Sequence, residues 1–224
     1  MLIPRSGTIE TARCIDNRAA FELISTEGHH CDVWRTSGVR RLGQRRNRFD
    51  VVVKIYREEC GFPALRMLDK EYRLLRAQLE DIVPASVFLF GGFAGVIKGL
   101  AIAEAVNPWF NVANPVNEAE AIPLLRRLPK AQNQLLRFCH AARKWEFERH
   151  SKIIDLYGVD NLVLNTNREL RYLDSFHVFF YSDMLKLDPD DDMLRRKMEV
   201  SVNRRQYLDN VLDEVKKTRV AVTP

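Results

Sequence analysis

The first part of the chain carries apolar residues at the spacing of β-strands. Three runs, at residues 21–24, 31–34 and 51–56, combine β-branched or aromatic residues with alternating polar positions. Charged and turn-forming residues separate the runs. We therefore expect three successive strands that pair as an antiparallel meander.

A helical period and a second strand pair follow. At residues 64–79, leucines and one tyrosine recur every three or four positions, which is the spacing of an amphipathic helix. Residues 83–106 are almost entirely apolar and approach the length of a membrane-spanning helix. Pro84 and four glycines interrupt this stretch, so we predict two buried strands, at 86–90 and 96–103, and no membrane span.

The second part of the chain is expected to be mainly helical. Residues 107–117 are rich in asparagine and proline, which is typical of a linker. After it the sequence predicts helices at 118–128 and 130–150, a hairpin with strands at 161–164 and 170–173, and helices at 191–202 and 204–217. The expected fold class is α+β with two lobes. Residues 1–106 would form a five-stranded sheet plus one helix, and residues 107–224 a helical lobe that contains the hairpin.

Charge and cysteine content narrow the classes of function. The 224 residues are 46% hydrophobic, which excludes a disordered chain. Thirty-five Lys and Arg against 30 Asp and Glu give a net charge of +5, a mild bias that suits phosphate-bearing ligands. The four cysteines lie far apart, so neither a zinc site nor a disulfide framework is expected. The N-terminus lacks the pattern of a secretory signal, so we expect a cytoplasmic protein, with export as an effector without a cleaved signal as the alternative.

One segment concentrates positive charge. Six arginines and no acidic residue occur from Arg35 to Arg48, together with Gly38 and Gly43. We expect this segment to be an exposed basic loop. Two interpretations stay open: a solvated linker, or a surface that contacts an acidic protein, a phosphorylated sugar or an anionic membrane.

Five polar residues form the candidate chemistry of the chain. Lys54 lies within a valine-rich strand, and a lysine on a buried face requires a carboxylate partner. Glu71 lies on the amphipathic helix that follows. Asp155, Asn161 and Asp174 flank the predicted hairpin and carry the hard oxygen donors that Mg²⁺ prefers. Each of the three could alone be an ordinary turn residue, but their joint spacing with Lys54 and Glu71 indicates a nucleotide site.

The order of these elements and motifs resembles the protein-kinase-like superfamily. Residues 52–55, Val-Val-Lys-Ile, resemble the third-strand V-A-I-K motif, and Glu71 stands on the helix that supplies the glutamate partner of that lysine. Residues 154–164 and 172–176 resemble the catalytic loop and the D-F-G-type metal aspartate. The resemblance covers residues 21–180. It implies a two-lobed protein-kinase-like fold with an antiparallel-sheet N-lobe and a reduced helical C-lobe.

The resemblance also implies ATP and Mg²⁺ as cofactors and transfer of the γ-phosphate to a hydroxyl group. It assigns Lys54 and Glu71 to the positioning of the phosphates. Asn161 and Asp174 would hold the metal. Asp155 would be the base that accepts the proton of the attacking hydroxyl.

Four further residues complete the nucleotide site that the resemblance implies. Gly28 and Val33 stand where the family has its phosphate-covering loop, with one glycine in place of three. Glu104 and Val106 stand where kinases bind the adenine edge through backbone groups.

The match to the catalytic loop is close but not identical. The loop is one residue longer than the D-x-x-x-x-N of the family, isoleucines replace the usual His-Arg, and Asp174-Ser-Phe replaces Asp-Phe-Gly. Asp160 is therefore an alternative to Asp155 as the base. His150 is a candidate replacement for the missing loop histidine, although a helix-end histidine without a catalytic role explains it more simply.

Only 48 residues follow Phe176, so we expect no full activation segment. With this short C-terminal part the chain is similar to compact bacterial kinases, such as YrbL-like proteins, lipopolysaccharide-core sugar kinases and short effector kinases. A protein Ser or Thr is the favoured acceptor and a sugar the alternative. A nucleotide-binding pseudokinase scaffold is the rival from another class. No nucleic-acid partner is expected, because the chain has neither an RNP-type aromatic strand nor a KH-type glycine loop.

Overall fold

The computed structural model of the chain describes residues 10–14, 17–26, 28, 30–42, 45–93 and 95–220. It is a mixed α+β protein whose sheets are antiparallel. Two compact units are present. The first contains the described residues up to Lys70 together with Pro84–Ala105, and the second contains Glu71–Val83 and the described residues from Val106 onward. The units differ from the expected lobes, 1–106 and 107–224, in the segment Glu71–Val83.

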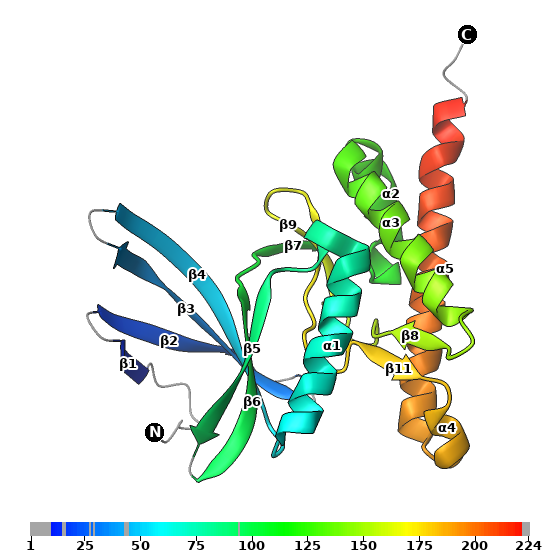
Figure 1. Cartoon of the computed structure of the whole chain (residues 1–224). Coiled ribbons are helices and arrows are strands. Elements are labelled where there is room, and N and C mark those ends of the chain that lie inside the picture. Colours follow the sequence, from blue (N-terminus) through cyan, green and yellow to red (C-terminus); the bar gives the residue numbers. More distant parts are fainter. Residues whose placement is uncertain are drawn as a thin grey trace. The chain divides into compact units, whose positions relative to one another are not determined.

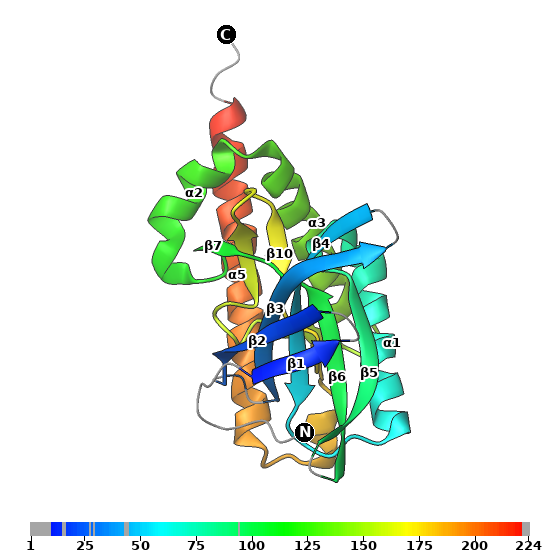
Figure 2. The ribbon, with the colours of Figure 1, turned by 90° about the vertical axis from the view of Figure 1, so that its left-hand side faces the viewer.

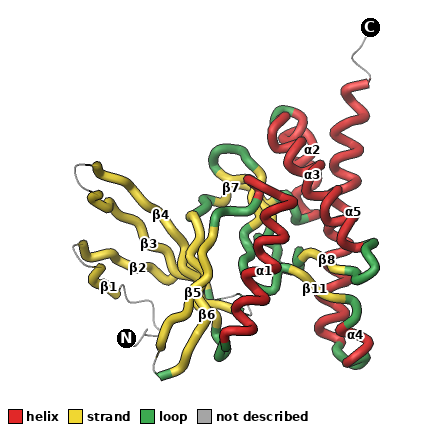
Figure 3. The backbone as a smooth tube through the Cα atoms, in the orientation of Figure 1, coloured by secondary structure: helices red, strands yellow, loops and turns green. Residues whose placement is uncertain are grey.

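Strands make up most of the first unit (Figures 1 and 3). Its sheet has six strands in the order β1-β2-β3-β4-β6-β5, where five were expected. The strands are β1 (Glu10–Cys14), β2 (Asn17–Ser25), β3 (Cys31–Leu42), β4 (Arg45–Tyr56), β5 (Ser86–Phe93) and β6 (Val96–Glu104). The additional strand is β1, whose sequence Glu-Thr-Ala-Arg-Cys has too few large apolar residues to be recognised as a strand.

The apolar stretch after α1 (Phe62–Leu79) forms a strand pair, as predicted. Every second residue of β6 from Gly99 to Ala103 is buried, which is the alternation of a half-covered strand. A Cβ atom at Gly99 would lie 3.0 Å from Leu65 Cδ1, so the glycine allows α1 to approach the sheet. Among the helices of the described residues, none combines the length and the apolar character needed to cross a membrane.

The prediction of an exposed basic loop at residues 35–48 is wrong. β3 and β4 pair without interruption from Cys31–Tyr56 to Leu42–Arg45, so the described part of this segment is a long hairpin. The pairing of β3 with β2 ends at Thr36, and the pairing of β4 with β6 ends at Val51. From these residues to the turn, β3 and β4 pair only with each other among the described strands and form a two-stranded ribbon (Figure 2). Gly38 is opposite Phe49, and a Cβ at this position would lie 2.9 Å from the ring. The glycine therefore accommodates a cross-strand aromatic ring.

Helices form the frame of the second unit (Figures 1 and 3). The second half of α1 leads into a short 3₁₀ turn at Glu80–Ile82. The other helices are α2 (Glu118–Arg126), α3 (Pro129–Glu146), α4 (Met184–Leu187) and α5 (Asp192–Val220), with a 3₁₀ turn at Pro115–Asn117. α2 continues through an internal proline, Pro123. α2 and α3 both pack against α5.

Two small sheets complete the second unit. β7 (Pro108–Asn111), β9 (Leu162–Asn165) and β10 (Leu170–Tyr172) form one sheet in the order β10-β9-β7. β8 (Lys152–Ile154) pairs with β11 (Phe179–Tyr181) in the other. The β9–β10 hairpin is confirmed. β7 lies within residues 107–117, which were expected to be only a linker.

The two expected C-terminal helices are one continuous helix, α5. The prediction of a break near Asn203 is wrong, because the sequence from Asp192 to Val220 contains neither proline nor glycine. Four apolar residues in its second half are buried and hold it against the other helices: Leu208, Val211, Leu212 and Val215.

Candidate functional site

Lys54 lies inside the six-stranded sheet of the first unit. β4 has β3 on one side and β6 on the other, and Lys54 is directly opposite Val33 and Ala101. Directly opposed residues share a face of the sheet, so Lys54 and Val33 are neighbours on one face. The side chain of Lys54 is buried, with 8% of the residue exposed. The strand pattern therefore places a buried cation beside the valine that was predicted to contact the nucleotide.

The other predicted nucleotide-binding residues of the first unit are less constrained. Gly28 lies on an exposed bend, and a Cβ there would meet only the carbonyl oxygen of Cys31, at 3.7 Å. Nothing in the described surroundings therefore requires a glycine at this position. Glu104 is exposed at the end of β6, and its N–H donates to the carbonyl of Ala85 (3.1 Å), so this N–H is already used. Val106, half-buried, begins the long segment of the second unit.

The second unit brings Asp155, Asn161 and Asp174 together. Asp155 directly follows β8, and its N–H donates to the carbonyl of Val178 (2.9 Å). Its own carbonyl accepts two hydrogen bonds, one from Asn161 Nδ2 (3.1 Å) and one from the Tyr172 hydroxyl (3.0 Å). The backbone of the candidate base is thus fastened on both sides by residues that are distant in sequence.

Asn161 uses its amide nitrogen for the loop and leaves its oxygen for other contacts. With Nδ2 bonded to Asp155, no described residue donates a hydrogen bond to Oδ1. A Cβ at Gly158 would lie 2.5 Å from this oxygen, a distance that no side chain tolerates. Gly158 therefore makes room for the Asn161 amide. This oxygen is the atom that a metal would need.

Two carboxylates interact at the centre of the cluster. Burial, and then the negative charge of Asp174, raise the pKa of Asp155 to about 7. The N–H of Tyr157 donates to Asp155 Oδ1 (2.7 Å) and opposes this shift. Asp174 Oδ1 accepts from the N–H of Ser175 (2.8 Å). The arrangement joins one carboxyl group with a pKa near neutral, which suits a general base, to a second carboxylate and an amide oxygen.

The donor set fits Mg²⁺ only together with a phosphate ligand. Among the described residues, no three His, Cys, Asp or Glu side chains lie close enough together to hold a metal on their own. Asn161 and Asp174 offer two hard oxygen ligands, which is the usual number where substrate phosphates and water complete the shell of Mg²⁺. The residues present are therefore compatible with Mg²⁺ that arrives with a nucleotide.

Glu71 is held by the β8–β11 sheet. The hydroxyl of Tyr181 donates to Glu71 Oε1 (2.6 Å), and Lys152, which is opposite Tyr181 in the sheet, also acts on Glu71. Burial raises the pKa of Glu71, and these two partners oppose that shift. The pairing of Glu71 with Lys54 stays a prediction.

The two alternative residues point to other contacts. Asp160 is exposed, and its Oδ1 accepts from Asn111 Nδ2 of β7 (2.9 Å). His150 is also exposed, and its Nδ1 lies 3.4 Å from Asp183 Oδ2. Within the described residues, only Asp155 of the two candidate bases is linked to both Asn161 and Asp174.

Several contributors to the site were missed by sequence reasoning. Tyr172 was recognised only as a strand residue, and Ser201 and Arg204 of α5 were not singled out. Ser201 Oγ accepts from the N–H of Leu156 (3.1 Å), and Arg204 donates to backbone carbonyls of the same loop. Their shared helix face was visible in the spacing, but only the tertiary fold shows which segment that face meets.

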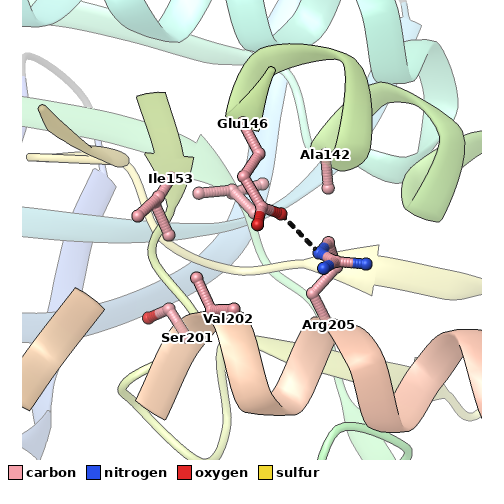
Figure 4. A pocket seen from close by; sticks show the side chains of 7 residues that line it. Ala142, Glu146, Ile153, Ser201, Val202 and Arg205 are labelled. Carbon is pink, nitrogen blue, oxygen red and sulfur yellow. Dashed lines mark ion pairs between the residues drawn. The ribbon is translucent and has the colours of Figure 1, made fainter. Parts of the chain in front are cut away.

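A small pocket lies between α3, β8 and α5 (Figure 4). Its lining residues are Ala142, Glu146, Ile153, Ile154, Ser201, Val202 and Arg205. Arg205 Nε pairs with Glu146 Oε2 (2.7 Å), and Arg205 also pairs with Asp209. A buried cation that pairs with two carboxylates has a structural role, and the pair of Arg205 with Glu146 joins α5 to α3. We therefore do not assign this pocket as the ligand site.

No protein-family model matches the chain, and no curated protein matches its sequence.

Proposed function

We propose that the protein is an ATP-dependent phosphotransferase that moves the γ-phosphate of Mg-ATP to a hydroxyl group. The observation that carries this proposal is the cluster of Asp155, Asn161 and Asp174 around the base of the β9–β10 hairpin. The cluster combines oxygen ligands for a divalent cation with a carboxyl group that can accept a proton. These are the groups that phosphoryl transfer from a metal nucleotide requires.

In the proposed reaction, Asp155 accepts the proton of the acceptor hydroxyl. The hydroxyl oxygen forms a bond to the γ-phosphorus, and the bond from the γ-phosphorus to the bridging oxygen breaks, so ADP leaves with that electron pair. Asn161 and Asp174 would hold Mg²⁺, which neutralises charge on the β- and γ-phosphates. Asp155 is preferred to Asp160 because Asp160 is exposed and bonded to Asn111.

Lys54 and Glu71 would position the phosphates. The burial of Lys54 inside the sheet supports this role, because an ammonium group removed from water acts strongly on an anionic ligand. The proposal requires Glu71 to exchange or share its hydrogen bond from Tyr181 when it pairs with Lys54. Val33, opposite Lys54, would contact the adenine ring, and the backbone of Glu104 and Val106 its edge.

The proposed acceptor is the hydroxyl group of a protein Ser or Thr. A sugar hydroxyl is the alternative acceptor. The basic β3–β4 hairpin would contact an anionic acceptor or surface. We propose a cytoplasmic site of action.

Incubation of the purified chain with γ-labelled ATP and Mg²⁺, alone and with a cell lysate, tests the proposal. Label should appear on the chain or on a lysate component, and EDTA or the Asp174→Ala substitution should abolish it. Lys130→Ala is a matched surface control and should leave labelling unchanged, because its ion pair with Glu169 is exposed.

Two outcomes would contradict the proposal. Labelling that persists in the Asp174→Ala variant would come from a contaminant or from another site. A thermal shift with ATP in the absence of any transfer, to protein or to a panel of sugars, would favour a pseudokinase.

A further inference from the structure

One face of α5 is directed at the loop that carries Asp155. Lys197, Ser201 and Arg204 are spaced by four and three residues, so they lie on the same side of the helix. All three interact with the segment Asp155–Tyr157. The sequence gives no other role to this face.

The hydrogen bonds of this face are made to the loop backbone. Ser201 Oγ, in a residue that is 1% exposed, accepts from the N–H of Leu156 (3.1 Å). Arg204 Nη1 donates to the carbonyl of Leu156 (2.5 Å) and to that of Tyr157 (2.6 Å). Lys197 Nζ lies 6.0 Å from the centre of the Tyr157 ring.

A single peptide group connects Arg204 to the carboxylate of Asp155. The peptide between Leu156 and Tyr157 presents its carbonyl to Arg204 Nη1 and its N–H to Asp155 Oδ1 (2.7 Å). Because a peptide group is planar and rigid, holding its oxygen fixes the direction of its N–H. The guanidinium therefore orients the side chain of Asp155 without touching it.

The preceding peptide group is held in the same way. Its N–H, from Leu156, is bonded to Ser201, and its carbonyl, from Asp155, accepts from Asn161 and Tyr172. Two successive peptide groups are thus fixed at both ends. The N–H and the carbonyl of each of these two peptide groups therefore have a hydrogen-bond partner.

The neighbouring arginine shows that this use of Arg204 is specific. Arg205, which is buried, forms ion pairs with Glu146 and Asp209. Among the described residues, Arg204 forms no ion pair with a carboxylate; burial lowers its pKa, and the charges of Asp155 and Tyr157 oppose this shift. A half-buried guanidinium that donates to two carbonyls of one loop holds that loop in position.

We propose that Arg204 is a positioning residue that, with Ser201, aims the carboxylate of Asp155 for phosphoryl transfer. This inference rests on the proposed function. The Arg204→Met variant should lower kcat by about 10- to 100-fold while the KM for ATP changes by less than about twofold, because a misdirected base affects the transition state and not nucleotide binding. Arg204→Lys should recover part of the loss, and added guanidinium should partly rescue Arg204→Met.

Arg196→Met, at an exposed position of the same helix, is the matched control and should behave as the wild type. Hydrogen exchange of the Leu156 and Tyr157 amides gives a second readout that does not depend on activity. Exchange at both amides should be faster in Arg204→Met than in Arg196→Met.

The outcomes separate this inference from the proposed function. If the wild type transfers phosphate and Arg204→Met keeps its kcat, the positioning role is wrong. If the wild type transfers no phosphate, the proposed function fails, and the exchange data alone decide whether Arg204 orders the loop. Unchanged exchange in Arg204→Met would overturn the inference in either case.

Discussion

Lys54 and Asp155 are both candidate site residues, but the chain holds them by different means. Lys54 is placed by the register of its own strand between β3 and β6. Asp155 is placed by hydrogen bonds from Asn161, from Tyr172 on β10 and from α5 by way of the next residues. One position depends on a regular ladder and the other on a few individual contacts.

This difference predicts which substitutions should affect each of the two residues. In a sheet, the backbone ladder keeps its geometry when one side chain changes, so a substitution removes chemistry alone. In the Asp155 loop, each partner contributes a separate bond, so a substitution far from the chemistry can displace the base. Four sets of substitutions test this contrast.

The largest effect is expected at Lys54. Lys54→Met should lower phosphate transfer by about 100- to 1,000-fold, because it removes a preorganised charge while the strand register stays intact. Lys98→Met, on β6, is the control, since Lys98 donates to the carbonyl of Arg57 (2.7 Å) and belongs to no predicted site. Transfer assays with circular dichroism as a fold check decide; equal losses of activity in both variants would remove the special role of Lys54.

A pair of glycine substitutions probes the two candidate loops. Gly158→Ala places a Cβ against Asn161 Oδ1 and must displace this amide, so transfer should fall by about 100-fold. A Cβ at Gly28 would make only an ordinary contact, 3.7 Å from the carbonyl oxygen of Cys31, so Gly28→Ala should change the KM for ATP little. Steady-state kinetics of both variants at several Mg²⁺ concentrations provide the measurement. The reverse ranking would move the critical loop to Gly28.

Two tyrosines differ in what their hydroxyls do. The Tyr172 hydroxyl is bonded to the carbonyl of Asp155, so Tyr172→Phe should lower the free energy of unfolding by about 1 kcal/mol. The Tyr207 hydroxyl is buried and has no hydrogen-bond partner among the described residues, so Tyr207→Phe should be neutral or stabilising. Urea unfolding measures both. A Tyr172→Phe variant with the same free energy of unfolding as the wild type would mean that the loop does not depend on this hydrogen bond.

The smallest effect concerns Glu71 and pH. Burial raises the pKa of Glu71 in the folded state, so ionisation of Glu71 costs stability as the pH rises from the ordinary glutamate range through this higher pKa. Glu71→Gln lacks this cost. Its melting temperature relative to the wild type should therefore increase slightly across that window and level off above it. A difference that is constant with pH would show that the Tyr181 and Lys152 contacts compensate fully for burial.

Local pattern predicted much of the fold and little of the support of the site. The valine run of β4, the leucine period of α1 and the glycine-divided pair β5–β6 are local signals, and the structure contains all of them. The Arg35–Arg48 segment was misread because its charges and glycines are typical of loops. A two-stranded ribbon tolerates charge on both faces, and Gly38 serves the ring of Phe49.

The support of Asp155 could not be read from the sequence for a different reason. The predicted site residues Asp155, Asn161 and Asp174 do lie together, since the hairpin between them is local. Ser201 and Arg204 reach the loop only after α5 has packed against α3. Sequence spacing identifies a helix face but not its tertiary neighbour.

The rates of single-turnover transfer by Asp155→Asn and Asp160→Asn decide which of the two carboxyl groups is the base. Both substitutions replace a carboxyl group by an amide and keep the size of the side chain. Asp155→Asn should lose at least about 100-fold in the rate of transfer with ATP binding retained, whereas Asp160→Asn should transfer as the wild type does. Loss of transfer in Asp160→Asn with full activity in Asp155→Asn would contradict this prediction.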